Sequence, residues 1–310
     1  MILSTIDIGT NTILMVTAEA RPDGTIQILG DEHAIARLGK GVDASRTIVP
    51  ETFSRMADFL LRYRQIAESH NAERIIAFGT SAIRDASNQQ EFIAQMTERT
   101  GITIEVLSGN DEARWTYRGA LFGIASAASQ SPAVAVLDIG GGSTEIAVGN
   151  GSQLQNSISL DIGAVRAAER CFSGLPPSAA ELANARKFAC AELAKTFELP
   201  PQTIAVGVAG TVTTLGAMHA GMEQFNAEAL NGRWLPAGFI HSTAERLAGL
   251  TLAETAAIPQ INSGRADIIL AGAIILDEFM RRYQLPALMV STRGVRYGVM
   301  LREFGQQSPQ

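Results

Sequence analysis

The chain has 310 residues, of which 46% are hydrophobic and 18% charged, and its formal net charge is −6. This length is typical of two domains, and the composition is typical of a soluble enzyme. The sequence holds no long basic run, which argues against a nucleic-acid partner. Its longest apolar stretch, residues 268–276, is too short to span a bilayer and predicts a buried helix. A cytoplasmic protein with no membrane partner is therefore expected.

Apolar periodicity and turn residues predict an α/β first half. Three strands come first, and helices and strands then alternate. The expected strands are residues 2–8, 13–20, 25–33, 74–78 and 102–107. The expected helices are residues 50–69, beginning at Pro50, residues 88–100, and one that starts near residue 110.

The second half repeats this order of elements. Its expected strands are residues 133–139, 145–149, 153–160, 203–209 and 287–291. Its expected helices are residues 164–173, 178–198, 211–220, 242–256, 264–283 and 294–304. The stretch 125–132 is small, polar and ends in proline, which places the expected boundary near residue 125 and the domains at 1–125 and 126–310.

A glycine-rich segment in the middle of the chain carries the clearest chemical signal. Residues 136–149 read V-L-D-I-G-G-G-S-T-E-I-A-V-G, which predicts a strand, a tight turn and a second strand. Gly140, Gly141 and Gly142 have no Cβ, so their N–H groups can approach an anion closely. Ser143 and Thr144 add hydroxyl donors. The turn is therefore predicted to bind phosphate.

Two acids flank this turn, Asp138 before it and Glu145 after it. Carboxylates are the ligands that a hard cation such as Mg2+ prefers, and phosphate with Mg2+ is the simplest ligand that uses all of these groups. Mg2+ is the expected cofactor, and a monovalent cation such as K+ is a second candidate. The alternative is a glycine-rich hairpin without a ligand.

The same phrase occurs at the start of the chain. Residues 6–16 read I-D-I-G-T-N-T-I-L-M-V, so that Asp7 matches Asp138 and Gly9 matches Gly140. The loop of the second copy is interpreted as slightly longer. A repeat spaced by nearly half the chain indicates a duplicated domain. Two such loops facing each other across a cleft would hold a phosphate chain from both sides. The phosphate ligands expected from the first copy are Gly9, Thr10, Asn11 and Thr12.

Four further segments give the chain a family resemblance. They are G-T-S-A-I-R-D-A-S-N (79–88), S-G-N-D-E-A-R (108–114), G-V-A-G-T-V-T-T-L (207–215) and S-T-R-G-V-R-Y-G (291–298). With the two loops, they make the sequence similar to the Ppx/GppA family of exopolyphosphatases and guanosine pentaphosphate phosphohydrolases, from residue 3 to about residue 301. The segment 108–114 is the specific one, and Asp111 in it stands where the family often has glutamate.

The resemblance implies an α/β fold of two ribonuclease-H-like domains with a cleft between them, as in actin, the sugar kinases and the chaperone ATPases. It also implies that the final helix, about 294–310, packs back on the first domain. The chain resembles the short, two-domain form of the family.

The resemblance also implies the catalytic residues. Glu112 is expected to activate the attacking water, and Glu145 to be the second acid, which helps to hold the water or the metal. Asp7 and Asp138 end equivalent strands and are the expected Mg2+ ligands, together with Glu145. Taken alone, Glu112 also fits an acid that merely favours the helix dipole at an N-terminus.

Arginines are the expected phosphate clamps. Arg84 and then Arg37 are the preferred ones, because both lie in family-like segments. The turn at Gly210 and Thr211 joins a strand to a helix, whose N-terminus offers N–H groups to an anion. This turn could hold a guanosine moiety, a further phosphate, or nothing.

These features predict a Mg2+-dependent hydrolase that releases orthophosphate from inorganic polyphosphate. The near alternative is removal of the 5′ γ-phosphate of guanosine pentaphosphate, which yields the tetraphosphate. A kinase of the same superfamily and a non-catalytic nucleotide-binding protein are more distant alternatives. A homodimer is the default expectation for the oligomeric state.

Overall fold

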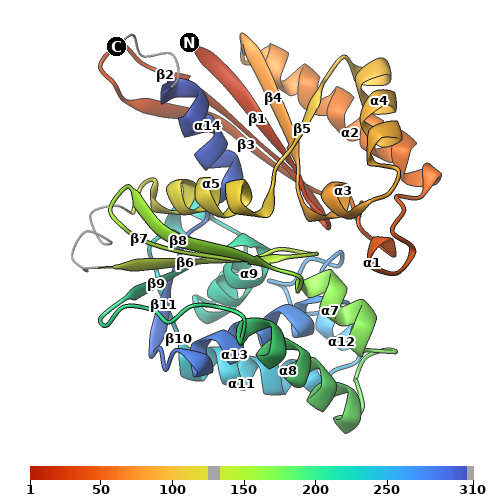
Figure 1. Cartoon of the computed structure of the whole chain (residues 1–310), viewed down its shortest axis with the longest axis vertical. Coiled ribbons are helices and arrows are strands. Elements are labelled where there is room, and N and C mark those ends of the chain that lie inside the picture. Colours follow the sequence, from red (N-terminus) through yellow and green to blue (C-terminus); the bar gives the residue numbers. More distant parts are fainter. Residues whose placement is uncertain (125–132, 306–310) are drawn as a thin grey trace. The chain divides into compact units, whose positions relative to one another are not determined.

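The computed structural model describes residues 1–124 and 133–305, and the described residues form two compact units (Figure 1). Unit 1 is Met1–Gly119 together with the chain from Val295 onward, and unit 2 is Ala120–Gly294. The stretch 125–132, where the sequence predicts the domain boundary, lies outside the described residues. The contacts divide the chain between Gly119 and Ala120, within helix α5.

Unit 1 is built on a five-stranded mixed sheet in the order β3-β2-β1-β4-β5. Strands β1, β2 and β3 pair antiparallel, whereas β4 and β5 run parallel to β1. The strands are β1 Ile2–Ile8, β2 Thr12–Ala20, β3 Ile26–Ile35, β4 Arg74–Gly79 and β5 Ile104–Val106. The helices are α1 Val42–Ser45, α2 Pro50–Ser69, α3 Ser81–Asp85, α4 Gln89–Thr100, α5 Gly109–Leu121, which continues into unit 2, and α14 Val295–Gly305.

Helices cover both faces of this sheet. Successive strand residues point to opposite faces, so neighbouring residues of one strand pack against different helices. On one face, Ala77 of β4 joins the core that α2 and α4 form. On the other face, the next residue, Phe78, packs with Val295 and Val299 of α14. The last helix of the chain therefore belongs to the first sheet, where it lies against β1 and β2.

Unit 2 repeats the topology with one added strand. Its six-stranded sheet has the order β10-β11-β9-β6-β7-β8, so β8-β7-β6-β9-β11 corresponds to β3-β2-β1-β4-β5 of unit 1. The strands are β6 Val134–Ile139, β7 Thr144–Asn150, β8 Gln153–Leu160, β9 Ile204–Val208, β10 Trp234–Pro236 and β11 Ala287–Val290. The helices are α7 Ala164–Cys171, α8 Ala179–Leu193, α9 Ala209–His219, α10 Ala227–Leu230, α11 Ala237–Ala248, α12 Leu252–Ala256 and α13 Ile269–Arg282.

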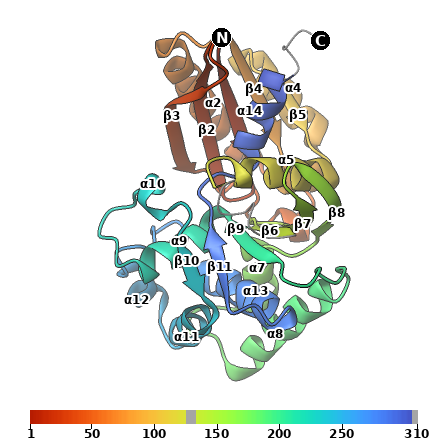
Figure 2. The same cartoon turned by 90° about the vertical axis from the view of Figure 1, so that its left-hand side faces the viewer.

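Helix α13 is the central helix of unit 2. It contacts α7, α8, α9 and α11 (Figure 2). Its residues from Ile269 to Asp277 are buried without a break. The prediction of a buried helix at the apolar stretch 268–276 is therefore confirmed. None of the helices in the described residues combines the length and apolarity that a membrane crossing requires.

Most predicted elements are present, and the clearest error is the single helix predicted over residues 242–256. The structure has two helices there, α11 and α12. Gly249 ends the first, and Thr251 begins the second by accepting a hydrogen bond from the N–H of Glu254, whose carboxylate bonds back to Thr251. Such a reciprocal cap starts a new helix even where the apolar spacing continues.

The other differences concern short elements. The structure adds α1, α3, α10 and the edge strand β10, each of which has three to five residues. Elements of this length show too few residues for a hydrophobic period to be recognised, and tertiary contacts decide their conformation.

Candidate active site

The loop between β1 and β2 is a tight four-residue turn. The N–H of Gly9 donates to the carbonyl of Thr12 at 2.9 Å, and Ile8 pairs with Ile13 across the turn. Thr10 and Asn11, in the middle of the turn, are buried. The strands therefore hold the predicted phosphate ligands of unit 1 in one compact turn.

The loop between β6 and β7 has the same geometry. The N–H of Gly140 donates to the carbonyl of Ser143 at 3.0 Å, and Ile139 pairs with Thr144. Both turns therefore contain four residues, and the interpretation of a longer second loop is wrong. The extra glycines of the second copy replace Thr10 and Asn11 instead of lengthening the turn. Thr144, already in β7, is fully buried, and its hydroxyl donates to the carbonyl of Ile162.

The N-terminus of α7 fixes the orientation of the second loop. The N–H of Ala164 donates to the carbonyl of Gly140 at 2.9 Å, and the N–H of Val165 donates to that of Gly141 at 2.8 Å. In a trans peptide the N–H points opposite to the carbonyl. The N–H groups of Gly141 and Gly142 therefore point away from α7, which is the orientation that an anion-binding turn needs.

Gly163, just before α7, makes this contact possible. A Cβ at Gly163 would lie 2.5 Å from the carbonyl carbon of Gly141, too close for any side chain. Gly163 belongs to none of the motifs in the sequence. Its one signal is a glycine at the start of a predicted helix, which is common at helix caps.

The segment 36–39 holds the loop of unit 1 in the same way. The N–H of Gly39 donates to the carbonyl of Thr10 at 2.8 Å, and the N–H of Arg37 donates to that of Asn11 at 2.9 Å. A Cβ at Gly39 would lie 2.3 Å from the Cγ2 of Thr10. Arg37 itself has a φ of 49°, the left-handed conformation that residues with a side chain rarely adopt. Each loop is thus held through its carbonyls by a neighbouring segment that contains an indispensable glycine.

The two acids of unit 2 lie directly opposite each other. Asp138 and Glu145 are partners in the antiparallel pair β6–β7, so their side chains leave the same face of the sheet. They are only 8% and 1% exposed, and Ser159 of β8 donates to the Oε1 of Glu145 at 2.6 Å. Asp7 has Leu14 as its partner on β2, so only the second copy carries two acids.

Glu112 lies in the first turn of α5, in an ion pair with Arg84. The Nη1 of Arg84 donates to the Oε2 of Glu112 at 2.8 Å and to the carbonyl of Leu107 at 3.0 Å. Burial raises the pKa of Glu112, and the charge of Arg84 opposes this rise. The structure thus brings together the predicted base and the preferred arginine, and Arg84 contacts the base in addition to the phosphate role predicted for it.

Asp111, the departure from the family pattern, has a local role. Its backbone N–H donates to the Oγ of Ser108 at 3.1 Å, and that hydroxyl donates to the carboxylate of Asp111 at 2.7 Å. The Asp111 side chain therefore stabilises the N-terminus of α5, next to Glu112.

The turn at Gly210 is bordered by an arginine that the sequence analysis missed. The Nη1 of Arg265 lies 3.4 Å from the carbonyl of Gly210 and 3.3 Å from the Oγ1 of Thr214. A Cβ at Gly210 would meet the guanidinium at 2.6 Å, and Ala209 beside it has a φ of 65°. Burial lowers the pKa of Arg265.

Thr211 lies in the first turn of α9 and packs inward. A Cβ at Gly272 of α13 would lie 2.2 Å from its hydroxyl, so the two helices cross closely there. The side chain of Thr211 thus takes part in the packing of α9 against α13, whereas Arg265 lies beside the turn at Gly210. Nothing in the sequence marked Arg265, because it precedes an apolar helix without any motif of its own.

The topology and the loops together define the class of the protein. Each unit has the strand order of a ribonuclease-H-like domain and a glycine-containing turn after its first strand. Two such units define a two-domain protein of the superfamily of actin, sugar kinases and chaperone ATPases.

Comparison with known proteins identifies the family. The model of the Ppx/GppA phosphatase family matches residues 16–307. Exopolyphosphatase 2 of Mycobacterium tuberculosis is 35% identical, over 96% of this chain and 97% of its own. The crystal structure of the Aquifex aeolicus family member aligns with a TM-score of 0.83 at 28% identity, covering 100% of this chain and 99% of that one. An exopolyphosphatase structure from Cytophaga hutchinsonii aligns with a TM-score of 0.88 at 25% identity, covering 99% of both chains.

The chain therefore belongs to the Ppx/GppA phosphatase family, and the predicted fold and family are both confirmed.

Proposed function

We propose that the chain is an exopolyphosphatase that releases orthophosphate from the end of inorganic polyphosphate. The loop of unit 2 carries this proposal. Its carbonyls accept hydrogen bonds from the N-terminus of α7, so its N–H groups point away from that helix, as anion binding requires. Two nearly buried carboxylates lie on the strands beside it. The relative from Mycobacterium tuberculosis, which is named an exopolyphosphatase, supports polyphosphate as the substrate.

Glu112 acts as the base in the proposed reaction. Its carboxylate accepts a proton from water, the water oxygen attacks the terminal phosphorus, and the bond to the bridging oxygen breaks, leaving a chain shorter by one phosphate. Arg84, 2.8 Å from Glu112, favours the ionised carboxylate and so opposes burial, which is the larger effect and raises the pKa of Glu112. The phosphate loops and Arg37 position the chain.

The carboxylates of unit 2 fit a divalent cation. Like charges directly opposite each other in a sheet are destabilising, and a cation between Asp138 and Glu145 would remove this repulsion. We propose that Asp138 and Glu145 hold Mg2+. In the described residues no group of three or more His, Cys, Asp and Glu side chains is placed to bind a metal. The remaining ligands would be phosphate oxygens and water, as is usual for Mg2+. The cation would neutralise part of the negative charge of the phosphate.

The test measures phosphate release with Mg2+ from long polyphosphate, tripolyphosphate, guanosine pentaphosphate and ATP. Glu112→Gln is expected to lower turnover at least about a hundredfold with binding nearly intact, because it removes a positioned base. Glu98→Gln is the matched control, since Glu98 is an exposed glutamate on α4. Equal turnover by Glu112→Gln and the native chain would overturn the role of Glu112.

The same assay decides the substrate. If phosphate is released faster from guanosine pentaphosphate than from either polyphosphate, the chain is a guanosine pentaphosphate phosphohydrolase and not an exopolyphosphatase. No release from any of the four would exclude hydrolysis. Phosphate transfer seen only with an added acceptor would identify a kinase instead.

A further inference from the structure

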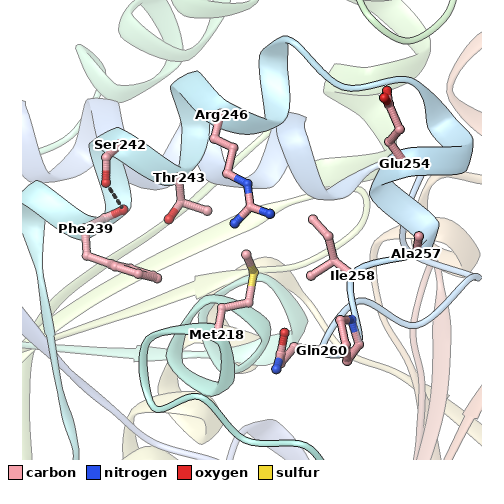
Figure 3. Close-up of a pocket in the computed structure, with 10 residues that line it drawn as sticks. Met218, Phe239, Ser242, Thr243, Arg246, Glu254, Ala257, Ile258 and Gln260 are labelled. Atoms are coloured by element: carbon pink, nitrogen blue, oxygen red, sulfur yellow. Dashed lines mark hydrogen bonds between the residues drawn. The ribbon is translucent and has the colours of Figure 1, made fainter.

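A separate cavity lies in unit 2, between α9, α11 and α12 (Figure 3). Its volume is about 600 Å3, within the range of roughly 300–1,000 Å3 that is usual for small-molecule sites. Met218 of α9 lines it, eight residues after Gly210, which is about 12 Å along the helix. The cavity is therefore distinct from the turn at Gly210, and no proposed catalytic, metal or phosphate residue lines it.

One side of the cavity carries a cation. The side chain of Arg246 points into it from α11, towards Met218 and Ile258 (Figure 3). Within residues 1–124 and 133–305, the Arg246 guanidinium has no ion-pair or hydrogen-bond partner. Glu254 is the only acid that lines the cavity, and its Oε2 already accepts two hydrogen bonds from Thr251 in the cap of α12. An anion would thus find a positive charge that no lining carboxylate neutralises.

Neutral polar groups lie beside this cation. Thr243, one turn before Arg246, is only 5% exposed, and its hydroxyl has no hydrogen-bond partner among the residues the structure describes. On the opposite wall, the Nε2 of Gln260 donates to the carbonyl of Met222 at 2.8 Å. This bond fixes the amide of Gln260, whose Oε1 is left as an acceptor. Arg246 and Thr243 can donate to an anionic head group, and Gln260 can accept from a ligand.

The remaining walls are apolar. The side chains of Met218, Phe239 and Ile258 line the cavity around the guanidinium (Figure 3). The ring of Phe239 is held in an edge-to-face contact with His219, with the ring centroids 4.8 Å apart. A fixed aromatic ring and a thioether are favourable partners for a flat apolar group. Inorganic phosphate would leave these walls in contact with water.

We propose that this cavity binds a small organic anion with a flat aromatic body, whose anionic group pairs with Arg246 and whose rings pack on Phe239 and Met218. This site is additional to the proposed active site and does not depend on the proposed reaction. The net charge of the chain, −6, opposes non-specific binding of anions, so binding requires a local cation such as Arg246.

The test is a fluorescence titration of the full chain with 8-anilinonaphthalene-1-sulfonate, an aromatic anion whose emission rises in apolar sites. Arg246→Ala is expected to weaken binding at least tenfold, because it removes the cation. Ala257→Glu is the second variant, since Ala257 is exposed on the rim and a carboxylate there repels the probe without disturbing the core. It is expected to weaken binding by a similar factor.

Arg62→Ala is the matched control, because Arg62 is an exposed arginine on α2 in unit 1 and its loss changes the net charge equally. It is expected to bind the probe like the native chain. A native chain that does not bind the probe would overturn the proposal, and so would Arg246→Ala binding as tightly as the native chain. A loss of phosphatase activity in the Glu112→Gln assay has no bearing on this outcome, so the two proposals fail separately.

Discussion

At the scale of single residues, the pair of Arg84 and Glu112 matters most. A carboxylate in a buried place is pushed towards its neutral form, which cannot accept a proton from water. The Arg84 guanidinium at 2.8 Å counteracts this effect. A predicted phosphate ligand thus also contacts the proposed base and limits the rise of its pKa.

This pair predicts the pH dependence of activity. Burial raises the pKa of Glu112 and Arg84 opposes the rise, so Arg84→Gln is expected to raise that pKa further. The acidic limb of the profile of kcat/KM should move to higher pH, because the base must be ionised. Arg84→Lys, which keeps a positive charge, should leave the limb nearer to its native position. An unchanged limb in Arg84→Gln would show that Glu112 does not set it.

Gly163 gives a second prediction at this scale. A Cβ there would meet the backbone of Gly141 at 2.5 Å, so Gly163→Ala must displace the loop from α7. We expect kcat/KM to fall about tenfold or more, equivalent to roughly 1.4 kcal/mol of transition-state stabilisation. Gly174→Ala is the control, because a Cβ at the exposed Gly174 meets no atom within 4 Å. The loop would not depend on Gly163 if both variants kept native kcat/KM.

At the scale of elements, an ionic cluster joins three helices of unit 2. Asp277 of α13 is 2% exposed and accepts hydrogen bonds from Arg186 of α8 at 2.9 Å and from Arg281 at 3.3 Å. The Nδ1 of His241 on α11 lies 3.2 Å from it. Arg186 also pairs with Glu245 of α11 at 2.6 Å. The helices that cover α13 are therefore fixed by charge in addition to apolar packing.

Asp277→Asn is expected to destabilise unit 2 by about 2 kcal/mol, because it removes the buried negative charge to which Arg186, Arg281 and His241 bond. Burial raises the pKa of Asp277, but the hydrogen bonds from Arg186 and its neighbours outweigh burial and lower that pKa. Because the pKa of Asp277 is lowered in the folded state, its ionisation stabilises the fold at pH values above the ordinary aspartate pKa. This stabilisation is lost as the pH falls through the pKa of the folded state.

Urea unfolding at neutral pH and below about pH 4, near the ordinary pKa of aspartate, checks this prediction. The difference in unfolding free energy between the native chain and Asp277→Asn should shrink as the pH falls. A difference that stays constant would assign the effect to packing and not to ionisation.

At the scale of the whole molecule, the two units share a topology but not a chemistry. Both loops are four-residue turns held through their carbonyls, yet only unit 2 has a second acid, since Leu14 occupies the place of Glu145 in unit 1. The two units thus share a turn of the same geometry. The metal site proposed above lies in unit 2, where a carboxylate stands on the second strand.

This asymmetry predicts how ligands stabilise the molecule. In the Glu112→Gln variant, tripolyphosphate should raise the melting temperature, and more so with Mg2+, because a ligand that binds only the folded state stabilises it by about 2.7 kcal/mol at a hundredfold excess over Kd. Adding Asp138→Asn should remove the Mg2+-dependent part. Thermal unfolding with and without Mg2+ measures both effects, and an equal shift in the two variants would contradict the proposed metal site.

Local sequence signals determined much of this protein. The strand that carries Asp138, the presence of a tight glycine turn and the burial of the apolar run 268–276 were predicted correctly, because each depends on neighbouring residues: glycines permit the turn, and a continuous apolar run is buried. The predictions for Glu112 and Arg84 likewise come from short motifs, which carry the family resemblance.

Tertiary structure alone decided the contacts between distant segments. Gly163 and Gly39 matter because separate segments pass within a side chain's width of the loops, and Arg265 matters because the segment before α13 brings it to Gly210. The break between α11 and α12 and the edge strand β10 likewise follow from caps and pairing. Chain periodicity describes one element at a time, whereas close approach between elements depends on how the whole unit packs.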